Sequence, residues 1–127
     1  MFQIGINDFL EIGTKSGDEV VRNMEAAFEQ MFREAVAKGI KVYGGTVSPG
    51  TLSEEVDAYR QTLNTWIRQQ YAQGHIDELV DFDQLLREPD NPLVIVPTLR
   101  EDTVHPNLTG YKAMGDYVYS LLLEDLA

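Results

Sequence analysis

Apolar residues recur at helical spacing in three stretches of the chain, and a short apolar run precedes each stretch. Ser16 and Glu19 form an S-x-x-E capping box at the start of the first stretch. Gly39 and Gly74 are stop signals for the first and second. The pattern predicts three helices, which run from Ser16 to Lys38, from Thr51 or Ser53 to Gly74, and from Asn107 or Leu108 onward.

The three apolar runs predict strands at residues 2–4, 40–47 and 78–83. The Pro-containing segment 87–104 is interpreted mostly as loop, with an extended edge segment at 93–96 as the alternative. Strand and helix therefore alternate, which is typical of crossovers in a parallel sheet. The sequence predicts one α/β domain over residues 1–127, with about three parallel strands and flanking helices.

Composition narrows the possible partners. Ten Lys and Arg residues against 21 Asp and Glu give a formal net charge of -11, so nucleic acid and anionic lipid surfaces would be repelled. No apolar run approaches the roughly 20 residues that span a bilayer. The chain has no cysteine, which excludes disulfides, thiolate catalysis and zinc–thiolate sites. No signal peptide is visible, so a cytoplasmic location is the default expectation.

Residues suited to acyl-transfer chemistry follow the predicted strands, at whose carboxyl ends functional groups gather in such sheets. Asp102 and His105 stand three apart just before the last helix, so the carboxylate can accept from one imidazole nitrogen and leave the other to take a proton. Asn7 follows the first strand as an uncharged donor, suited to an oxyanion. These residues form part of an acyl-transfer site.

The motifs "GIND" at 5–8 and "DTVHPNLTGYKAM" at 102–114, with "YRQTLNTWIR" and "VDFDQLLREPDNP" between them, resemble the later sequence blocks of the SGNH (GDSL-type) hydrolases. These are esterases and lipases on a flavodoxin-like sheet. The resemblance implies that Asp102 and His105 are the acid and base of a triad, and that Asn7 is an oxyanion donor in a loop shaped by Gly5. The family's blocks with the nucleophilic serine and an oxyanion glycine have no counterpart here. By that pattern the chain is truncated at its N-terminus and begins at about the third of five strands.

Four serines could replace the missing nucleophile. Ser16 and Ser53 are best explained as helix caps, and Ser120 lies within the last helix. Ser48 is the best placed, because it follows the second strand in "TVSPG", a sequence close to the G-x-S-x-G nucleophile elbow. Pro49 argues against it, because the residue after an elbow nucleophile normally supplies an oxyanion N–H that proline lacks.

Other polar residues have simpler explanations. His75, beside a glycine, is expected at a helix end and not as a ligand. Asp81 and Asp83 could be half a metal site, but alternate residues of a strand point to opposite faces and do not easily hold one ion. We therefore expect no metal and no cofactor.

Two functional hypotheses remain. The first is an esterase for small, short-chain or activated carboxylic esters, weakly active because the family nucleophile is missing, which attacks through Ser48 or through water activated by His105. The second is an inactive fragment, or a self-associating interaction module, that keeps the scaffold. In either case an open sheet edge and apolar helix faces predict a homo-oligomer, most simply a dimer, that buries the surface around residues 1–4 and those faces.

Overall fold

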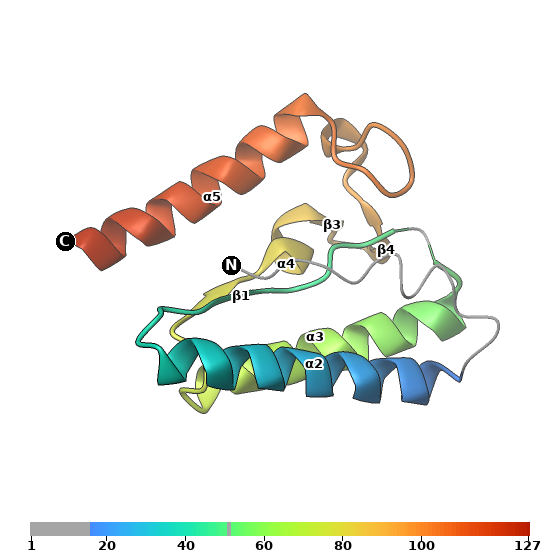
Figure 1. Ribbon diagram of the computed structural model, residues 1–127. Helices are drawn as coiled ribbons and strands as arrows, with labels where there is room; N and C mark the ends of the chain where they lie inside the picture. Colours follow the sequence, from blue (N-terminus) through green and yellow to red (C-terminus); the bar gives the residue numbers. More distant parts are fainter. Residues whose placement is uncertain (1–15, 51) are drawn as a thin grey trace.

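The structure is a computed structural model that describes residues 16–50 and 52–127 (Figure 1). The predicted strand at 2–4 lies outside the described residues. The described elements are α2 (Gly17–Ala37), β1 (Tyr43–Gly45), α3 (Glu54–Ala72), β2 (Glu78–Val80), α4 (Phe82–Leu86), β3 (Arg87–Glu88), β4 (Asn91–Ile95), the 3-10 helix η1 (Pro97–Leu99) and α5 (Leu108–Leu126).

The two long helices α2 and α3 have the predicted caps. The Ser16 side chain accepts from the Glu19 backbone N–H at 3.2 Å, and the Ser53 side chain accepts from the Val56 N–H at 3.3 Å. Both helices end before a glycine with positive φ, of 70° at Gly39 and 76° at Gly74. Most residues avoid this left-handed conformation, so the two glycines let the chain turn back toward the sheet.

Strands β1 and β2 pair in parallel, with Tyr43 opposite Glu78 and Gly45 opposite Val80. The helix α3 connects them, so the βαβ order read from the sequence is present and the α/β fold class is confirmed. A Cβ at Gly44 would lie 2.5 Å from the Ile76 Cδ1 atom, so a larger residue there would require the end of the Ile76 side chain to move. The wider flavodoxin-like order of strands stays a prediction.

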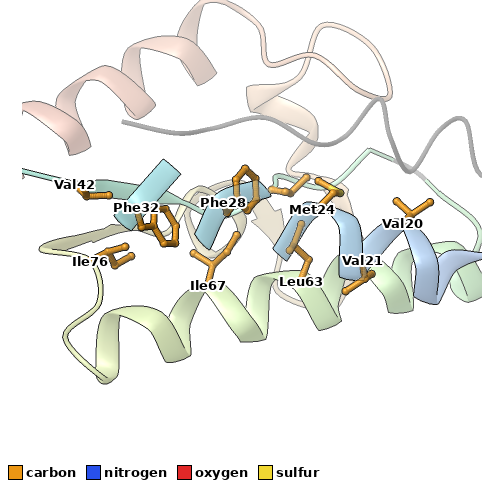
Figure 2. Packing of buried hydrophobic residues seen from close by; sticks show 10 residues of the cluster. Val20, Val21, Met24, Phe28, Phe32, Val42, Leu63, Ile67 and Ile76 are labelled. Atoms are coloured by element: carbon orange, nitrogen blue, oxygen red, sulfur yellow. The ribbon is translucent and has the colours of Figure 1, made fainter. Parts of the chain in front are cut away.

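The main core lies between α2, α3 and the parallel strands. Figure 2 shows Phe28 and Phe32 of α2 in one buried cluster with Ile67 of α3, and Leu63 of α3 is fully buried. The rings of Phe32 and Trp66 stack at 6.1 Å between centroids. Burial of these side chains is the main stabilising contribution on this side of the sheet. Helix α5 lies on the other side of the strands (Figure 1).

Three boundaries differ from the prediction. The strand predicted at 40–47 is limited to Tyr43–Gly45. The strand predicted at 78–83 ends at Val80, because the Asp81 side chain accepts from the Gln84 N–H at 3.2 Å and caps the short helix α4. The segment 87–104, interpreted mostly as loop, contains the antiparallel pair β3–β4. Pro92 lies within β4, because an edge strand tolerates proline. Proline usually indicates a loop, which is why the sequence pattern did not predict this strand. Among the described residues, no helix combines the length and the apolar character that are needed to cross a bilayer.

Candidate active site

Asp102 and His105 lie in the loop between η1 and α5, and their side chains are paired. Asp102 Oδ2 is 2.8 Å from His105 Nδ1, and Oδ1 is 3.1 Å from the same nitrogen. Both side chains are open to solvent, at 54% exposure for Asp102 and 65% for His105. When Nδ1 donates to the carboxylate, Nε2 is left as the proton acceptor. The contact expected from the three-residue spacing is therefore present, and the catalytic role of the pair stays a prediction.

The Asp102 carboxylate also closes the turn that carries His105. Its Oδ1 accepts from the backbone N–H groups of Val104 and His105, each at 2.7 Å. Together with the imidazole, these donors stabilise the ionised form, and they lower the pKa of Asp102 from 3.8 to about 2. The largest contribution comes from the His105 N–H, followed by that of Val104. Asp102 is therefore an anion throughout the pH range in which proteins usually work.

Backbone hydrogen bonds hold both ends of this loop together. The Glu101 N–H donates to the His105 carbonyl at 2.8 Å, and the Asn107 N–H donates to the Leu99 carbonyl at 2.8 Å. Arg100 and Pro106 form an antiparallel bridge between these two bonds. The exposed Asp–His pair therefore lies in a loop whose two ends are joined by backbone hydrogen bonds.

Asn107 and Gly110 explain the rest of the "HPNLTG" motif. The Asn107 Oδ1 accepts from the Gly110 N–H at 2.9 Å and caps α5, while its Nδ2 donates to the Thr98 carbonyl at 2.9 Å. A Cβ at Gly110 would lie 2.3 Å from the Leu99 carbonyl oxygen, so the helix can approach the loop this closely only with glycine. The motif thus fixes the start of α5 against the segment that precedes His105.

Ser48 lies in the segment that follows β1, where α3 holds the neighbouring backbone. Asn64 accepts from the Val47 N–H at 2.7 Å and donates to the Val47 carbonyl at 2.9 Å, and Arg60 donates to the same carbonyl at 2.8 Å. Ser48 itself is buried. Between described residues, no hydrogen bond joins Ser48 to Asp102 or His105. The nucleophilic role of Ser48 stays a prediction.

A buried ionic cluster lies beside this segment. The sequence analysis did not predict it. Arg60 donates to Asp57 at 2.6 Å, to Asp83 at 2.6 Å and to the Pro92 carbonyl at 3.1 Å. The arginine side chain is fully buried. The three-residue spacing of Asp57 and Arg60 on one helix was the available signal. The cluster joins α3, α4 and the β3–β4 hairpin at the end of the parallel strands.

Asp81 and Asp83 both take part in this cluster, contrary to the expectation that they face opposite sides of a strand. Arg68 donates to Asp81 at 2.9 Å and to Asp83 at 2.8 Å. They converge because Asp81 caps α4 and Asp83 lies in its first turn, so neither residue is within a strand. Burial alone would raise the pKa of Asp81, but hydrogen bonds from Arg68, the Gln84 N–H and Thr46 lower it below its ordinary value.

The comparison with known families decides where this fold belongs. A profile of the GDSL-like lipase/acylhydrolase family matches residues 1–113. The chain belongs to this family. A search of curated proteins gave no match.

Solved structures have the same fold as this GDSL-like chain. A GDSL-like lipase from Bacteroides thetaiotaomicron superimposes with a TM-score of 0.76 at 23% identity, over 97% of this chain and 60% of the other. An acylhydrolase from Bacteroides fragilis, described as putative, gives a TM-score of 0.72 at 21% identity, over 98% and 61%. A G-D-S-L family lipolytic protein from Desulfitobacterium hafniense, also described as putative, gives 0.72 at 20%, over 91% and 60%. The chain thus spans about three-fifths of the length of these structures.

Three further residues singled out in the sequence are Asn7, Gly5 and His75. Asn7 and Gly5 lie outside the described residues, so their oxyanion role stays a prediction. His75 follows the end of α3, and its Nδ1 lies 2.8 Å from the Gln70 Oε1 atom. It borders a cavity of about 440 Å³ between α2 and the end of α3. Among the described residues, no group of three or more His, Asp or Glu side chains is arranged to hold a metal ion.

Proposed function

We propose that this chain is an esterase of the GDSL-like lipase/acylhydrolase family that acts slowly on small, short-chain or activated carboxylic esters. His105 is the general base, Asp102 orients it, and Asn7 with the loop at Gly5 binds the oxyanion. Family membership supports acyl-ester chemistry. The observation that carries the proposal is the 2.8 Å contact between Asp102 Oδ2 and His105 Nδ1 on an exposed loop.

The pair has the arrangement that general-base catalysis requires. The carboxylate accepts the Nδ1 proton, which fixes the tautomer and leaves Nε2 with its lone pair. Nε2 removes a proton from the attacking hydroxyl group while the oxygen bonds to the ester carbonyl carbon. As the tetrahedral intermediate collapses, the C–O bond to the alcohol breaks and the imidazolium returns the proton to the departing alkoxide.

The attacking group is either water or Ser48, and we favour water. Ser48 is buried, its neighbour Val47 is held by α3, and Pro49 has no N–H to offer an oxyanion. With a serine, the first step would release the alcohol and leave an acyl ester on Ser48, which water would then hydrolyse. With water, the tetrahedral intermediate collapses directly to the acid and the alcohol, and no acyl-enzyme forms. Loss of one oxyanion donor typically costs about 100- to 1,000-fold in turnover, so slow hydrolysis is expected by either route.

Hydrolysis of 4-nitrophenyl acetate by the purified chain tests the proposal. His105→Ala should lower turnover about 100-fold or more, the usual contribution of a general base. His75→Ala is the matched control, because it removes the other histidine and should leave turnover unchanged. Equal rates for wild type and His105→Ala, or no hydrolysis above buffer, would refute the proposal.

A serine-reactive phosphonate followed by peptide mapping distinguishes the two attacking groups. Water attack predicts no label on Ser48 and unchanged hydrolysis in Ser48→Ala. Labelling of Ser48 that disappears in His105→Ala would instead identify the serine as the nucleophile. Either result is compatible with His105 as the base, so this test decides the mechanism within the proposed activity.

A second candidate function is that of a self-associating module that keeps the α/β scaffold without catalysis. The observation that favours it is the exposure of large apolar side chains along α5, among them Leu108, Tyr119 and Leu126. A surface of this kind typically marks an interaction site. Hydrolysis and self-association are separable, because the first depends on His105 and the second does not.

A further inference from the structure

Helix α5 packs through one face only. Within the described residues it packs mainly against η1, α4 and β2, and the Tyr117 ring meets Phe82 edge-on at 6.5 Å between centroids. Near its end, Asp125 also forms a salt bridge with Lys41 at 2.7 Å. Gly110 is the one residue of this helix that is buried. Figure 1 shows α5 along an outer edge of the molecule, with no labelled element on its far side.

The opposite face of α5 is nevertheless apolar. Six residues follow one another at intervals of three or four and form what we call the outer stripe: Leu108, Tyr111, Gly115, Tyr119, Leu122 and Leu126. Leu108 is 87% exposed, Tyr119 is 62% exposed and Leu126 is 83% exposed. A helix that is apolar on two faces is expected to be covered on both. The elements formed by residues 16–50 and 52–127 cover only the first.

Gly115 is the residue of the outer stripe that nothing in the described part of the chain explains. A Cβ there would meet no heavy atom within 4 Å, in contrast to the contact of 2.3 Å at Gly110. Glycine inside an exposed helix costs about 1 kcal/mol relative to alanine, so its presence favours close approach of another surface. Gly115 also borders a hollow of about 360 Å³, whose lining includes Tyr119 of the same helix together with Phe82, Met114, Val118 and Leu122.

We propose that a second copy of this chain covers the outer stripe, with the two α5 helices antiparallel about a two-fold axis near the level of Tyr117. The positions of the outer stripe are almost symmetric about residue 117, because 108 and 126, 111 and 122, and 115 and 119 lie at nearly equal distances from it along the helix. Leu108 therefore faces Leu126 of the other copy, and Tyr119 enters the hollow at the partner's Gly115. An isologous interface makes this contact twice. The proposal specifies the surface for the self-association suggested above and is independent of ester hydrolysis.

The exposed area of the outer stripe and the paired charges beside it are consistent with a second copy of the chain, whereas the net charge of the chain weakens the association. At about 200 Å² for a fully exposed large side chain, the five larger residues of the stripe present on the order of 650 Å², near the roughly 800 Å² per partner of a standard interface. The charges that flank the stripe are Lys112 and Asp116, which pair with each other, so closing the interface does not bury an isolated charge. Two copies at net charge -11 repel each other, so added salt should strengthen the dimer.

Sedimentation equilibrium of the full chain from about 1 to about 200 µM tests the proposal, because mass action makes a dimer concentration-dependent. We expect a monomer–dimer equilibrium whose Kd falls as NaCl rises from about 0.05 to about 0.5 M. Tyr119→Glu should raise Kd about tenfold or more, as loss of a central aromatic anchor does. Val36→Glu is the matched control, because Val36 is 58% exposed on α2 and should leave Kd unchanged.

A steric swap tests the register itself. Gly115→Leu fills the hollow and should abolish the dimer while the thermal midpoint of the monomer is kept. Tyr119→Ala in the same chain removes the opposing ring, so the double variant Gly115→Leu/Tyr119→Ala should dimerise again. A monomer at every concentration would overturn the proposal. A dimer that Tyr119→Glu and Gly115→Leu leave intact would also overturn it, because another surface would then be responsible.

Discussion

The side of the molecule built from α2 and α3 and the side built from α5 are both rich in apolar residues, but only the first is packed. Phe28 and Phe32 of α2 are buried against α3, whereas Leu108 and Leu126 of α5 are almost fully exposed. The first side also encloses a fully buried arginine, Arg60. The candidate Asp–His pair belongs to the second side. The pair therefore depends on a local backbone frame, and the core between α2 and α3 determines whether the chain folds.

The largest expected effect comes from breaking the buried ionic cluster. Arg60→Ala should lower the free energy of unfolding by about 3–5 kcal/mol, because it leaves the carboxylates of Asp57 and Asp83 buried without their partner. Arg33→Ala breaks an exposed pair with Glu29 and should cost no more than about 1 kcal/mol. Urea unfolding followed by circular dichroism measures both. Similar losses in the two variants would contradict the assignment of a buried ionic cluster to the packed side of the molecule.

Truncating the core should cost nearly as much. Leu63→Ala removes a fully buried side chain and should destabilise the chain by about 2–5 kcal/mol, including the cavity it leaves. Val36→Ala at an exposed position of α2 is the control and should change stability by about 0.5 kcal/mol or less. Thermal unfolding at a fixed protein concentration compares them. A small loss for Leu63→Ala would mean that the core is not held together as the structure has it.

The two glycines of α5 provide a test on the less packed side. Gly110→Ala forces its Cβ against the Leu99 carbonyl and should cost about 1–3 kcal/mol, with displacement of the loop that carries His105. Gly115→Ala has open space and should leave the monomer unchanged or stabilise it by up to about 1 kcal/mol. We expect Gly110→Ala to lower ester hydrolysis and Gly115→Ala to preserve it. If Gly115→Ala destabilised the chain and lowered hydrolysis while Gly110→Ala did neither, the close contact between Gly110 and Leu99 would not be what holds the loop in place.

The smallest effect concerns the exposed carboxylate of Asp102. Its pKa is lowered in the folded chain, so the stability it contributes is present above its ordinary value of 3.8 and is lost as the pH falls toward about 2. Asp102→Asn should remove that part of the acid dependence of the thermal midpoint. If the thermal midpoint falls below pH 3.8 in the same way in wild type and in Asp102→Asn, the hydrogen-bonded turn is contradicted.

The sequence by itself determined the elements whose signals are local. Ser16, Ser53 and Asn107 cap helices as their positions predict, and the three-residue spacing of Asp102 and His105 is enough to bring their side chains together within one turn. Hydrogen bonds between residues three apart depend little on the rest of the fold. The D-x-x-H-P-N stretch and the other motifs also indicated the family.

The tertiary structure decided what depends on residues far apart in the chain. Arg60 reads as an ordinary helix residue until Asp83 and the carbonyls of Val47 and Pro92 converge on it. Ser48 is the best placed serine by its position after a strand, but only the structure shows that Asn64 of α3 binds the neighbouring Val47 backbone and that the serine is buried. The periodicity of α5 likewise did not show which apolar face the chain would cover. Such contacts depend on the packing of elements many residues apart, which local spacing cannot specify.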